Sequence, residues 1–408
     1  MELLLKYGRI FDVYAEESYP ADILCEDERI VRIGSDLKPP VGCNVLNCSH
    51  KLIVPGLFNC HTHIAYNMDY PGRKQRYPFY TNEDSHEINP AYRAAVSVYL
   101  LRQMLKSGVT FIRNVGDRDY IDIGLRDALN DYENTHLTGP DMMCAGKCII
   151  MTGGHGWCDK GLSIEADGPD AVRKAAREQF KNGADMLKLM TTGGIMTPNV
   201  SPLHSQFTIE EIRAAVEEAH CIGRIVATHS QGSTGVKNAL RAGVDSIEHG
   251  NNMDEECIQM MIDQKTYYTP TLCAPEGILA DPHCPQFMKD KAADAIDALN
   301  HSVQMAYDAK VNIVCGTDTG TPSNGYDNTG HELVLMTRLG IPMAYALKAA
   351  TLTSANLCRV ADTRGSITEG KYADLAVFDE DLLDTPELIM KCYATIKHGV
   401  AYTSKHFL

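Results

Sequence analysis

Short apolar runs alternate with longer amphipathic segments through most of the chain, from about residue 53 to about residue 355. The amphipathic segments have helical spacing, and the runs have the length of buried strands. Helices are predicted over Ala91–Lys106, Asp170–Asn182, Thr208–His220 and Asp254–Gln264. Strands are predicted over Ile53–Asn59, Thr110–Val115, Met142–Ile150, Met186–Met190, Ile225–Thr228, Asp245–Ile247, Thr266–Thr269 and Asn312–Cys315.

This alternation of strands and helices predicts an α/β protein with a parallel sheet. Eight repeats of the pattern favour a closed (β/α)₈ TIM-like barrel, and a doubly wound open sheet is the alternative. Thr208-Ile209-Glu210-Glu211 has the spacing of a capping box, which predicts the start of one helix.

Both ends of the chain have a different pattern, in which short strand-like runs alternate with turn residues. We therefore expect one small β-sandwich module built from residues 1–55 and 356–408, beside a barrel of residues 56–355. Its runs are Leu3–Tyr7, Ala21–Cys25, Ile30–Ile33, Val45–Asn47, Gly365–Ile367, Ala373–Phe378, Ala394–Lys397 and Val400–Thr403.

Composition narrows the class of protein. The chain has 408 residues and a net charge of −15, which argues against binding to nucleic acids or anionic membranes. The 14 cysteines are scattered without a short-range repeat, as in a reduced cytosolic protein. No apolar stretch is long enough to span a membrane, and the N-terminus has no signal-peptide pattern. We expect a soluble, cytoplasmic protein.

Polar residues stand where five of the predicted strands end. Because catalytic groups of a parallel barrel come from the carboxyl ends of its strands, these residues should meet on one face. They are of the types that bind metal ions. In strand order they are His61 and His63, Lys188, His229, His249 and Asp318.

Each of these signals alone has a structural alternative. A His-x-His pair can arise by chance, and a single histidine after an apolar run is often a hydrogen-bonded core residue. Asp318 could be a turn aspartate. Lys188 lies in a run that should be buried, where an unpaired ammonium is costly. It needs either an acidic partner or conversion by CO₂ to a carbamate, and the joint occurrence favours a metal centre.

The chain resembles the amidohydrolase superfamily over nearly its whole length. Within that superfamily it is most similar to imidazolonepropionase-related dipeptidases and carboxypeptidases that act on prolyl or arginyl/lysyl peptide bonds. The matching segments are Val54–His63, Arg113–Gly116, Thr152–Gly156, Met186–Lys188, Thr192–Gly194, Ala227–His229, Ile247–Gly250, Gly316–Asp318, Gly365–Ile367, Gly370–Lys371 and Ala373–Leu375.

The resemblance implies a hydrolase that cleaves a peptide or N-acyl-amino-acid amide bond with two divalent metal ions. His61, His63 and Asp318 would bind the more buried ion, and His229 and His249 the second. A carboxylated Lys188 and a hydroxide would bridge the two ions, and the hydroxide would attack the scissile carbonyl. Asp318 would also be catalytic, by moving a proton from the nucleophile to the leaving amine. Nitrogen and oxygen ligands favour zinc.

Two further features of the site are expected after the first and third strands. His155 lies in a glycine-rich turn, and the resemblance implies a catalytic contact with the substrate carbonyl or carboxylate; a structural turn histidine is the alternative. Tyr66–Pro90 should lie over the mouth of the site as a lid or specificity loop. Its basic residues could attract a carboxylate or form a solvated face; they are Arg73, Lys74 and Arg76.

Two other functions remain open at this point. A cyclic-amide hydrolase or a deaminase on the same fold is the enzymatic alternative, although a mononuclear enzyme needs no lysine at position 188. A catalytically inactive relative that serves as a binding protein would lack some ligands, and none is missing here. We expect a small-molecule substrate, no nucleic-acid or membrane partner, and a homo-oligomer.

Overall fold

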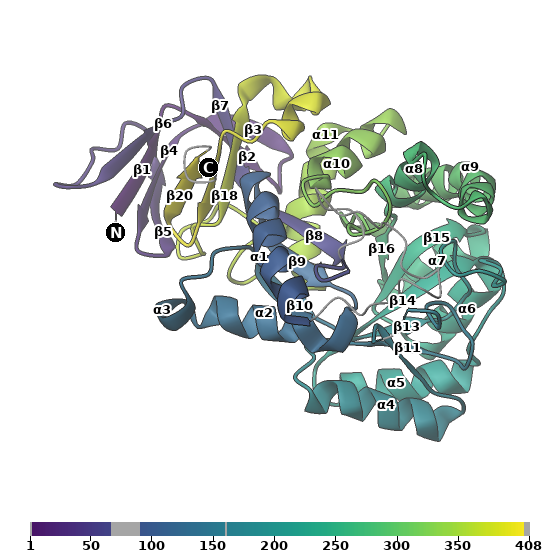
Figure 1. Ribbon diagram of the computed structural model, residues 1–408. Coiled ribbons are helices and arrows are strands. Elements are labelled where there is room, and N and C mark those ends of the chain that lie inside the picture. Colours follow the sequence, from purple (N-terminus) through teal and green to yellow (C-terminus); the bar gives the residue numbers. More distant parts are fainter. Residues whose placement is uncertain (1, 67–89, 160, 404–408) are drawn as a thin grey trace.

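The computed structural model describes residues 2–66, 90–159 and 161–403. Figure 1 shows a β-sandwich of purple and yellow strands beside a larger barrel of strands and helices. The fold predicted from the sequence, a (β/α)₈ barrel with a sandwich built from both termini, is confirmed. None of the described helices is long and apolar enough to cross a membrane.

The sandwich has two sheets, with strand orders β5-β4-β1-β6 and β20-β19-β18-β7-β2-β3. Inward-facing side chains of both sheets form one apolar core, which includes Leu5, Ile23, Ile53 and Leu375. The strands are β1 (Glu2–Lys6), β2 (Arg9–Asp12), β3 (Glu17–Pro20), β4 (Asp22–Glu26), β5 (Arg29–Gly34), β6 (Asn44–Asn47), β7 (Lys51–Pro55), β18 (Leu375–Asp379), β19 (Ala394–Lys397) and β20 (Val400–Thr403).

The barrel strands are parallel, and the strands Met186–Met190 and Ile225–Gly232 are buried along their length. The segment of three strands meets the segment of seven at two seams. Asp185 N donates to Cys144 O at 2.7 Å, and Cys60 N donates to Cys315 O at 2.7 Å. The strands are β8 (Leu57–Thr62), β9 (Val109–Asn114), β10 (Asp141–Cys144), β11 (Cys148–Ile150), β12 (Ser163–Glu165), β13 (Met186–Met190), β14 (Ile225–Gly232), β15 (Ser246–Asn252), β16 (Tyr267–Thr269) and β17 (Asn312–Ile313).

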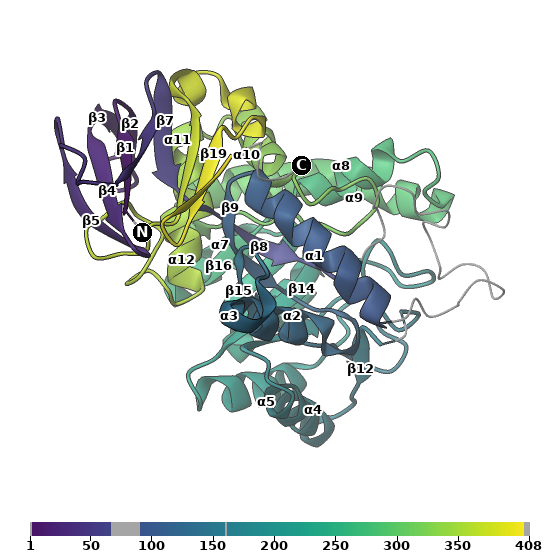
Figure 2. The ribbon, with the colours of Figure 1, turned by 60° about the vertical axis from the view of Figure 1, so that its left-hand side comes forward.

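Helices cover the outside of the barrel, and Figure 2 shows α1, α2, α4 and α5 lying against its strands. The predicted capping box is present, because Thr208 Oγ1 accepts from Glu211 N while Glu211 accepts from Thr208 N. The helices are α1 (Pro90–Lys106), α2 (Ile121–Asn130), α3 (Tyr132–Thr135), α4 (Pro169–Lys181), α5 (Ile209–His220), α6 (Ser233–Ala242), α7 (Glu255–Gln264), α8 (Cys273–Ala280), α9 (Gln286–Asp308), α10 (Thr329–Arg338), α11 (Met343–Lys348) and α12 (Ser354–Leu357).

Two of the predicted strands are each divided in the structure. The run Ile53–Asn59 spans β7 of the sandwich and β8 of the barrel, which are separated at Gly56. A Cβ atom on Gly56 would lie 2.2 Å from Thr110 Oγ1, so only glycine allows this crossing. The run Met142–Ile150 is divided into β10 and β11 around Gly146, which has a φ of 70°. Gly365–Ile367 is a turn and not a strand.

A cluster of charged side chains joins the sandwich to the start of β10. Lys397 Nζ lies 2.8 Å from Asp141 Oδ2 and 3.1 Å from Asp374 Oδ2, and Arg364 pairs with both carboxylates. His398 also donates its backbone N–H to Asp374. Two cations already neutralise the two carboxylates, so we assign this cluster a structural role rather than metal binding.

Asp374→Asn should destabilise the protein, because it removes one charge from this buried joint while Lys397 and Arg364 stay in place. The expected loss in the free energy of unfolding is on the order of 3 kcal/mol, measured by urea denaturation. Asp379→Asn is the matched control, because Asp379 ends β18, the strand that begins one residue after Asp374, and pairs with Lys51 at a more exposed position. Its loss should stay below about 1 kcal/mol. Equal losses in the free energy of unfolding for the two variants would show that this charged cluster contributes no more to stability than the more exposed pair of Asp379 and Lys51.

Candidate metal centre and active site

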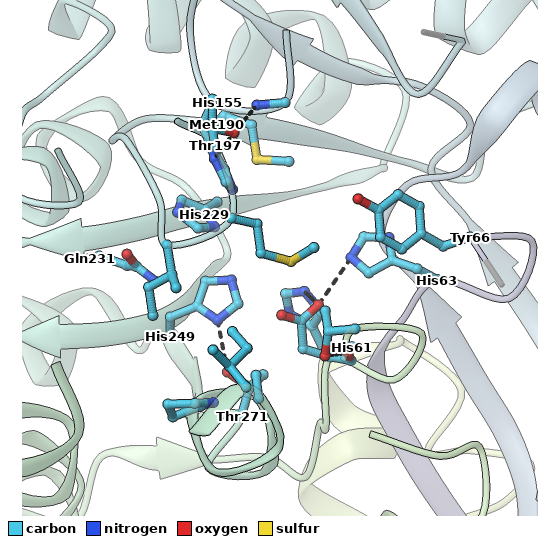
Figure 3. A pocket seen from close by; sticks show the side chains of 18 of the residues that line it. His61, His63, Tyr66, His155, Met190, Thr197, His229, Gln231, His249 and Thr271 are labelled. Atoms are coloured by element: carbon cyan, nitrogen blue, oxygen red, sulfur yellow. Dashed lines mark hydrogen bonds and ion pairs between the residues drawn. The ribbon is translucent and has the colours of Figure 1, made fainter. Parts of the chain in front are cut away.

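One pocket at the carboxyl ends of the barrel strands receives every candidate residue identified in the sequence. The space inside it, with the open mouth included, is about 870 Å³. Figure 3 shows several of the imidazoles pointing into it from different strands. The candidate residues that line it are His61, His63, His155, Lys188, His229, His249 and Asp318.

His61, His63 and Asp318 form the tightest cluster of metal-ligand side chains in the pocket. Asp318 Oδ1 lies 3.4 Å from His61 Nε2 and 3.2 Å from His63 Nε2. One ligand atom from each of the three residues falls within 4.8 Å of the others. His61 and His63 share a face of the chain because they are two residues apart, whereas Asp318 comes from the turn after β17.

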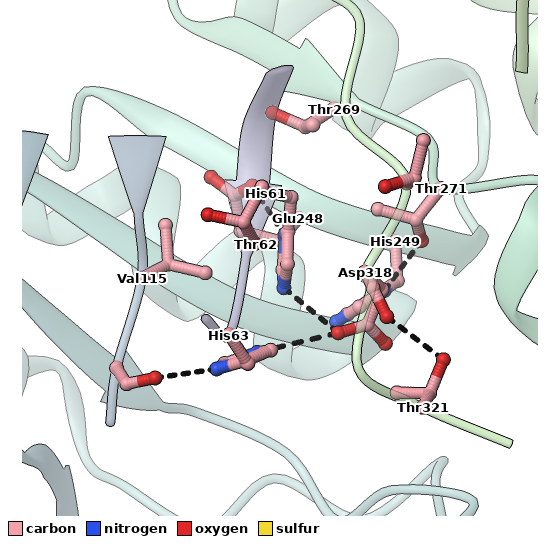
Figure 4. Close-up of polar contacts among 12 residues, drawn as sticks. His61, Thr62, His63, Val115, Glu248, His249, Thr269, Thr271, Asp318 and Thr321 are labelled. Carbon is pink, nitrogen blue, oxygen red and sulfur yellow. Dashed lines mark hydrogen bonds and ion pairs between the residues drawn. The ribbon is translucent and has the colours of Figure 1, made fainter. Parts of the chain in front are cut away.

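The second ring nitrogen of each of these imidazoles is held by the protein. His61 Nδ1 lies 2.8 Å from Glu248 Oε2, and His63 Nδ1 lies 2.6 Å from the Gly116 carbonyl oxygen. Figure 4 shows both contacts on the side of the rings opposite Asp318. Protein partners at Nδ1 fix the ring orientation and leave Nε2 free to bind a metal ion.

His229 and His249 lie side by side on the neighbouring strands β14 and β15. Their ring centroids are 4.5 Å apart, and the His249 ring is 4.8 Å from that of His61. His249 Nδ1 lies 2.7 Å from Thr271 Oγ1, whereas His229 Nε2 lies 3.0 Å from the Gly193 carbonyl oxygen. His249 therefore presents Nε2 to the pocket, and His229 presents Nδ1.

The exact positions on the strands differ from the sequence prediction. Lys188 is the central residue of β13 rather than its end, and β14 and β15 continue three residues beyond His229 and His249. Asp318 lies five residues beyond β17. The length of a strand depends on its hydrogen bonds with neighbouring strands. The apolar runs in the sequence therefore showed where the polar side chains begin, but not where each strand ends.

Lys188 is 1% exposed, and its ammonium nitrogen has no hydrogen-bond partner within the described part of the chain. Burial lowers the pKa of this amine, although Glu248 partly opposes the shift. An uncompensated ammonium in such a place is costly, so the neutral amine is favoured. The ion pair with an acid that the sequence left open is not formed with any described residue.

Most of the pocket imidazoles are neutral. Burial lowers the pKa of His229 and His249 well below the usual range, and neighbouring imidazoles add to the shift. Burial also lowers the pKa of His155 to about 3, with Lys291 adding to the shift. Burial alone would raise the pKa of Asp318, but His61, His63 and His249 together outweigh it, hold the pKa well below its usual range and keep the carboxylate ionised. Neutral imidazoles beside an anionic carboxylate are the protonation states that bind metal ions.

A buried ion pair lies beneath the metal-ligand cluster, inside the barrel. Arg113 on β9 contacts both carboxylate oxygens of Glu248 on β15, at 2.7 and 2.8 Å, and neither side chain is exposed. Glu248 also accepts from Ser246 Oγ at 2.5 Å and contacts His61. Arg113 donates to the Cys60 carbonyl, one residue before His61. The pair thus holds His61 through its ring and through its backbone.

His155 lies at the pocket wall, beside His229, with ring centroids 4.4 Å apart. Its Nδ1 lies 2.7 Å from Thr197 Oγ1, which also accepts from Gly156 N at 2.9 Å. Since that hydroxyl already accepts one hydrogen bond, its own proton is available to His155 Nδ1, and Nε2–H then points to the pocket. His155 is therefore a neutral hydrogen-bond donor at the wall.

The structure adds pocket residues that the sequence did not reveal. Gln231 and Asn251 follow His229 and His249 by two residues on the same strands, and their side-chain oxygens are buried without a hydrogen-bond partner in the described residues. The pattern His-x-Gln and His-x-Asn after adjacent apolar runs was the available signal. The expected lid Tyr66–Pro90, with Arg73, Lys74 and Arg76, lies almost wholly outside the described residues.

The pocket residues fit a divalent metal centre. Imidazole nitrogens and a carboxylate are zinc-type ligands, and three of them already converge within the reach of one ion. Their outer partners fix the rings as metal-binding histidines require. The Lys188 nitrogen, which has no hydrogen-bond partner among the described residues, lines the same pocket.

Known proteins with similar sequences share this architecture. A family model described as the Amidohydrolase family matches residues 52–401. Ochratoxinase of Aspergillus niger is 29% identical over 399 residues, covering 89% of this chain and 78% of its own length.

Solved structures agree over almost the whole chain. A Xaa-Pro dipeptidase with methionine bound in its active site is 30% identical, with a TM-score of 0.88 over 99% of this chain and 100% of its own. A putative prolidase from Bifidobacterium longum is 27% identical, with a TM-score of 0.83 over 98% and 94%. The resemblance found in the sequence motifs is confirmed: this chain belongs to the amidohydrolase family and is a hydrolase of amide C–N bonds.

Proposed function

We propose that this amide hydrolase uses two divalent metal ions, with zinc as the preferred metal, and that it cleaves peptides or N-acyl amino acids. His61, His63 and Asp318 would hold the more buried ion, and His229 and His249 the second. Lys188, carboxylated on Nζ, would bridge them. The ions would supply Lewis-acid activation of the scissile carbonyl and lower the pKa of a bound water to about 7.

Lys188 is the observation that carries the binuclear proposal. Its amine is buried in the pocket, is favoured in the neutral form, and has no acid bound to it among the described residues. A neutral amine attacks the carbon of CO₂ and loses a proton, which gives a carbamate anion. That reaction replaces a costly buried ammonium with an anionic ligand, where imidazoles on both sides can share metal ions with it. A mononuclear site would need no such residue.

The chain's own residues would move the proton and orient the substrate. Asp318 is ionised and faces the pocket, so it can take a proton from the attacking water and deliver it to the leaving nitrogen. His155 would donate from Nε2 to the substrate carbonyl or carboxylate oxygen. Its depressed pKa keeps the imidazole neutral at physiological pH.

The pocket walls and the similar proteins support the substrate class. Apolar side chains from loops and helices line the pocket beside the polar centre, so one substrate side chain can be apolar. The similarity to a Xaa-Pro dipeptidase and to a putative prolidase supports a substrate in which the cleaved amide bond lies next to an amino acid. The homo-oligomeric state and the cytoplasmic location stay predictions from the sequence. The apolar lining residues include Leu162, Ile195, Met196, Ile278 and Leu299.

Chelation should abolish amide hydrolysis, and zinc should restore it together with about two bound ions per chain. The measurement combines metal analysis by mass spectrometry with a screen of dipeptides, N-acyl amino acids and cyclic amides. We expect turnover of the dipeptides or N-acyl amino acids. Full activity with about one ion per chain would reject the binuclear centre, and turnover of only cyclic amides would select the alternative enzyme class.

Lys188→Ala should remove the bridging ligand and weaken metal binding by at least the roughly 10–100-fold seen when a supporting group of a metal site is lost. Activity should fall with it, and acetate should restore part of the activity by filling the space. Lys174→Ala, on an exposed position of α4, is the control and should change neither quantity. Crystallographic density for an unmodified amine in the active, metal-loaded protein would contradict the proposed carbamate.

Asp318→Asn should fold normally and lower kcat by about 10²–10⁴-fold, the usual contribution of a general acid–base residue. Asn tolerates the left-handed backbone of this position, where φ is 58°, so the turn is preserved. KM should change little, since the lost interaction belongs to the transition state.

Asp327→Asn, an exposed change in the same loop, is the control and should leave kcat and KM unaltered. Near-normal kcat with a raised KM in Asp318→Asn would instead make Asp318 a substrate contact.

A further inference from the structure

Lys291 on α9 holds the loop that follows β13. Its ammonium donates to three backbone carbonyl oxygens of that loop, Gly194 at 3.1 Å, Thr197 at 2.7 Å and Val200 at 2.7 Å. An ammonium has three N–H donors, so all of them are used. Hydrogen bonds from a charged donor are stronger than neutral ones. One side chain therefore fixes seven residues of a loop that has no helix or strand of its own.

The same loop orients two imidazoles of the pocket. The Gly193 carbonyl, next to the first anchored residue, lies 3.0 Å from His229 Nε2. Thr197, whose carbonyl is anchored by Lys291, contacts His155 Nδ1 through its hydroxyl at 2.7 Å. Figure 3 shows Thr197 and His155 joined at the wall of the pocket, next to His229. A displacement of the loop would move both contacts at once.

The loop is packed so closely that a shift of its backbone would also move the imidazoles. A Cβ atom on Gly194 would lie 2.3 Å from His155 Cε1, so the backbone rests directly against the ring. A Cβ atom on Gly193 would lie 2.1 Å from the Ser201 carbonyl oxygen, which shows a second close approach. Both glycines are needed for these approaches, and the charged anchor fixes the backbone that they bring close.

We infer that Lys291 is a positioning residue for the reaction: by clamping the loop after β13, it sets the orientation of His155 and His229. This inference rests on the proposed roles of those two histidines. Lys291 itself touches neither the metal ligands' nitrogen atoms nor the proposed substrate position, so it positions the two imidazoles through the backbone carbonyls that it anchors. Without the ammonium, three carbonyls lose their donor, and the loop is free to adopt other arrangements.

Lys291→Met tests the clamp, because methionine keeps the length of the side chain and removes its donors. Lys291→Arg restores a charged donor, and Lys289→Met is the matched control. Lys289 lies on the same helix, and its ammonium makes no hydrogen bond or ion pair with any described residue. Hydrogen exchange of the peptide covering residues 191–206, in the metal-free protein, measures the loop directly and needs no substrate.

In Lys291→Met we expect exchange in that peptide to become about 10- to 100-fold faster, as for loss of hydrogen bonds to a charged group. Metal affinity should fall, and kcat should fall by up to about 10²-fold, as for a misplacement near 1 Å. Lys291→Arg should recover part of each quantity, and Lys289→Met should leave all three unchanged.

Three results would overturn the inference. They are unchanged exchange in Lys291→Met, faster exchange with wild-type kcat and metal affinity, or a uniform rise in exchange across the whole chain that marks global destabilisation. A wild-type protein that hydrolyses no amide would reject the proposed substrates instead, and exchange and metal affinity would still decide the role of Lys291.

Discussion

The buried pair of Arg113 and Glu248 is the interaction on which the geometry of the site depends. Both charges lie inside the barrel with no exposure, and a buried charge persists only when its partner and its hydrogen bonds are complete. Burial alone would raise the pKa of Glu248, but Arg113 together with His61 and Lys188 outweighs it and keeps the carboxyl ionised. The ionised carboxylate then fixes His61. This costly buried ion pair therefore serves to orient one imidazole, that of His61.

The other imidazoles of the pocket carry little charge. The pocket has many nitrogen ligands but few charges, and burial keeps His229, His249 and His155 unprotonated. Asp318 is the anion facing His61 and His63. Neutral imidazoles beside an ionised carboxylate are in the protonation states that bind metal ions, so a cluster arranged in this way suits divalent cations.

Much of this site could be predicted from the sequence, and what could not has a physical cause. The spacing of His61 and His63 follows from strand geometry, and Lys188 stood out because an apolar run should not contain an ammonium. Arg113 and Glu248 are 135 residues apart in the sequence, so no local pattern predicts their contact. The role of Lys291 could not be predicted from the sequence either, because a lysine on a helix is usually solvated.

The structure also separates the residues that perform chemistry from those that shape the substrate pocket. The proposed metal ligands come mainly from barrel strands, whose hydrogen-bonded neighbours resist displacement on every side. The apolar wall residues lie outside those strands, with Ile195 in the loop after β13 and Ile278 on helix α8 after β16. Loops tolerate changes in sequence better than strands do. The loop after β13 forms part of the wall and also orients His155 and His229, so its backbone cannot vary freely. An anchor such as Lys291 meets both demands, because it fixes the backbone of the loop while the loop's side chains can still vary.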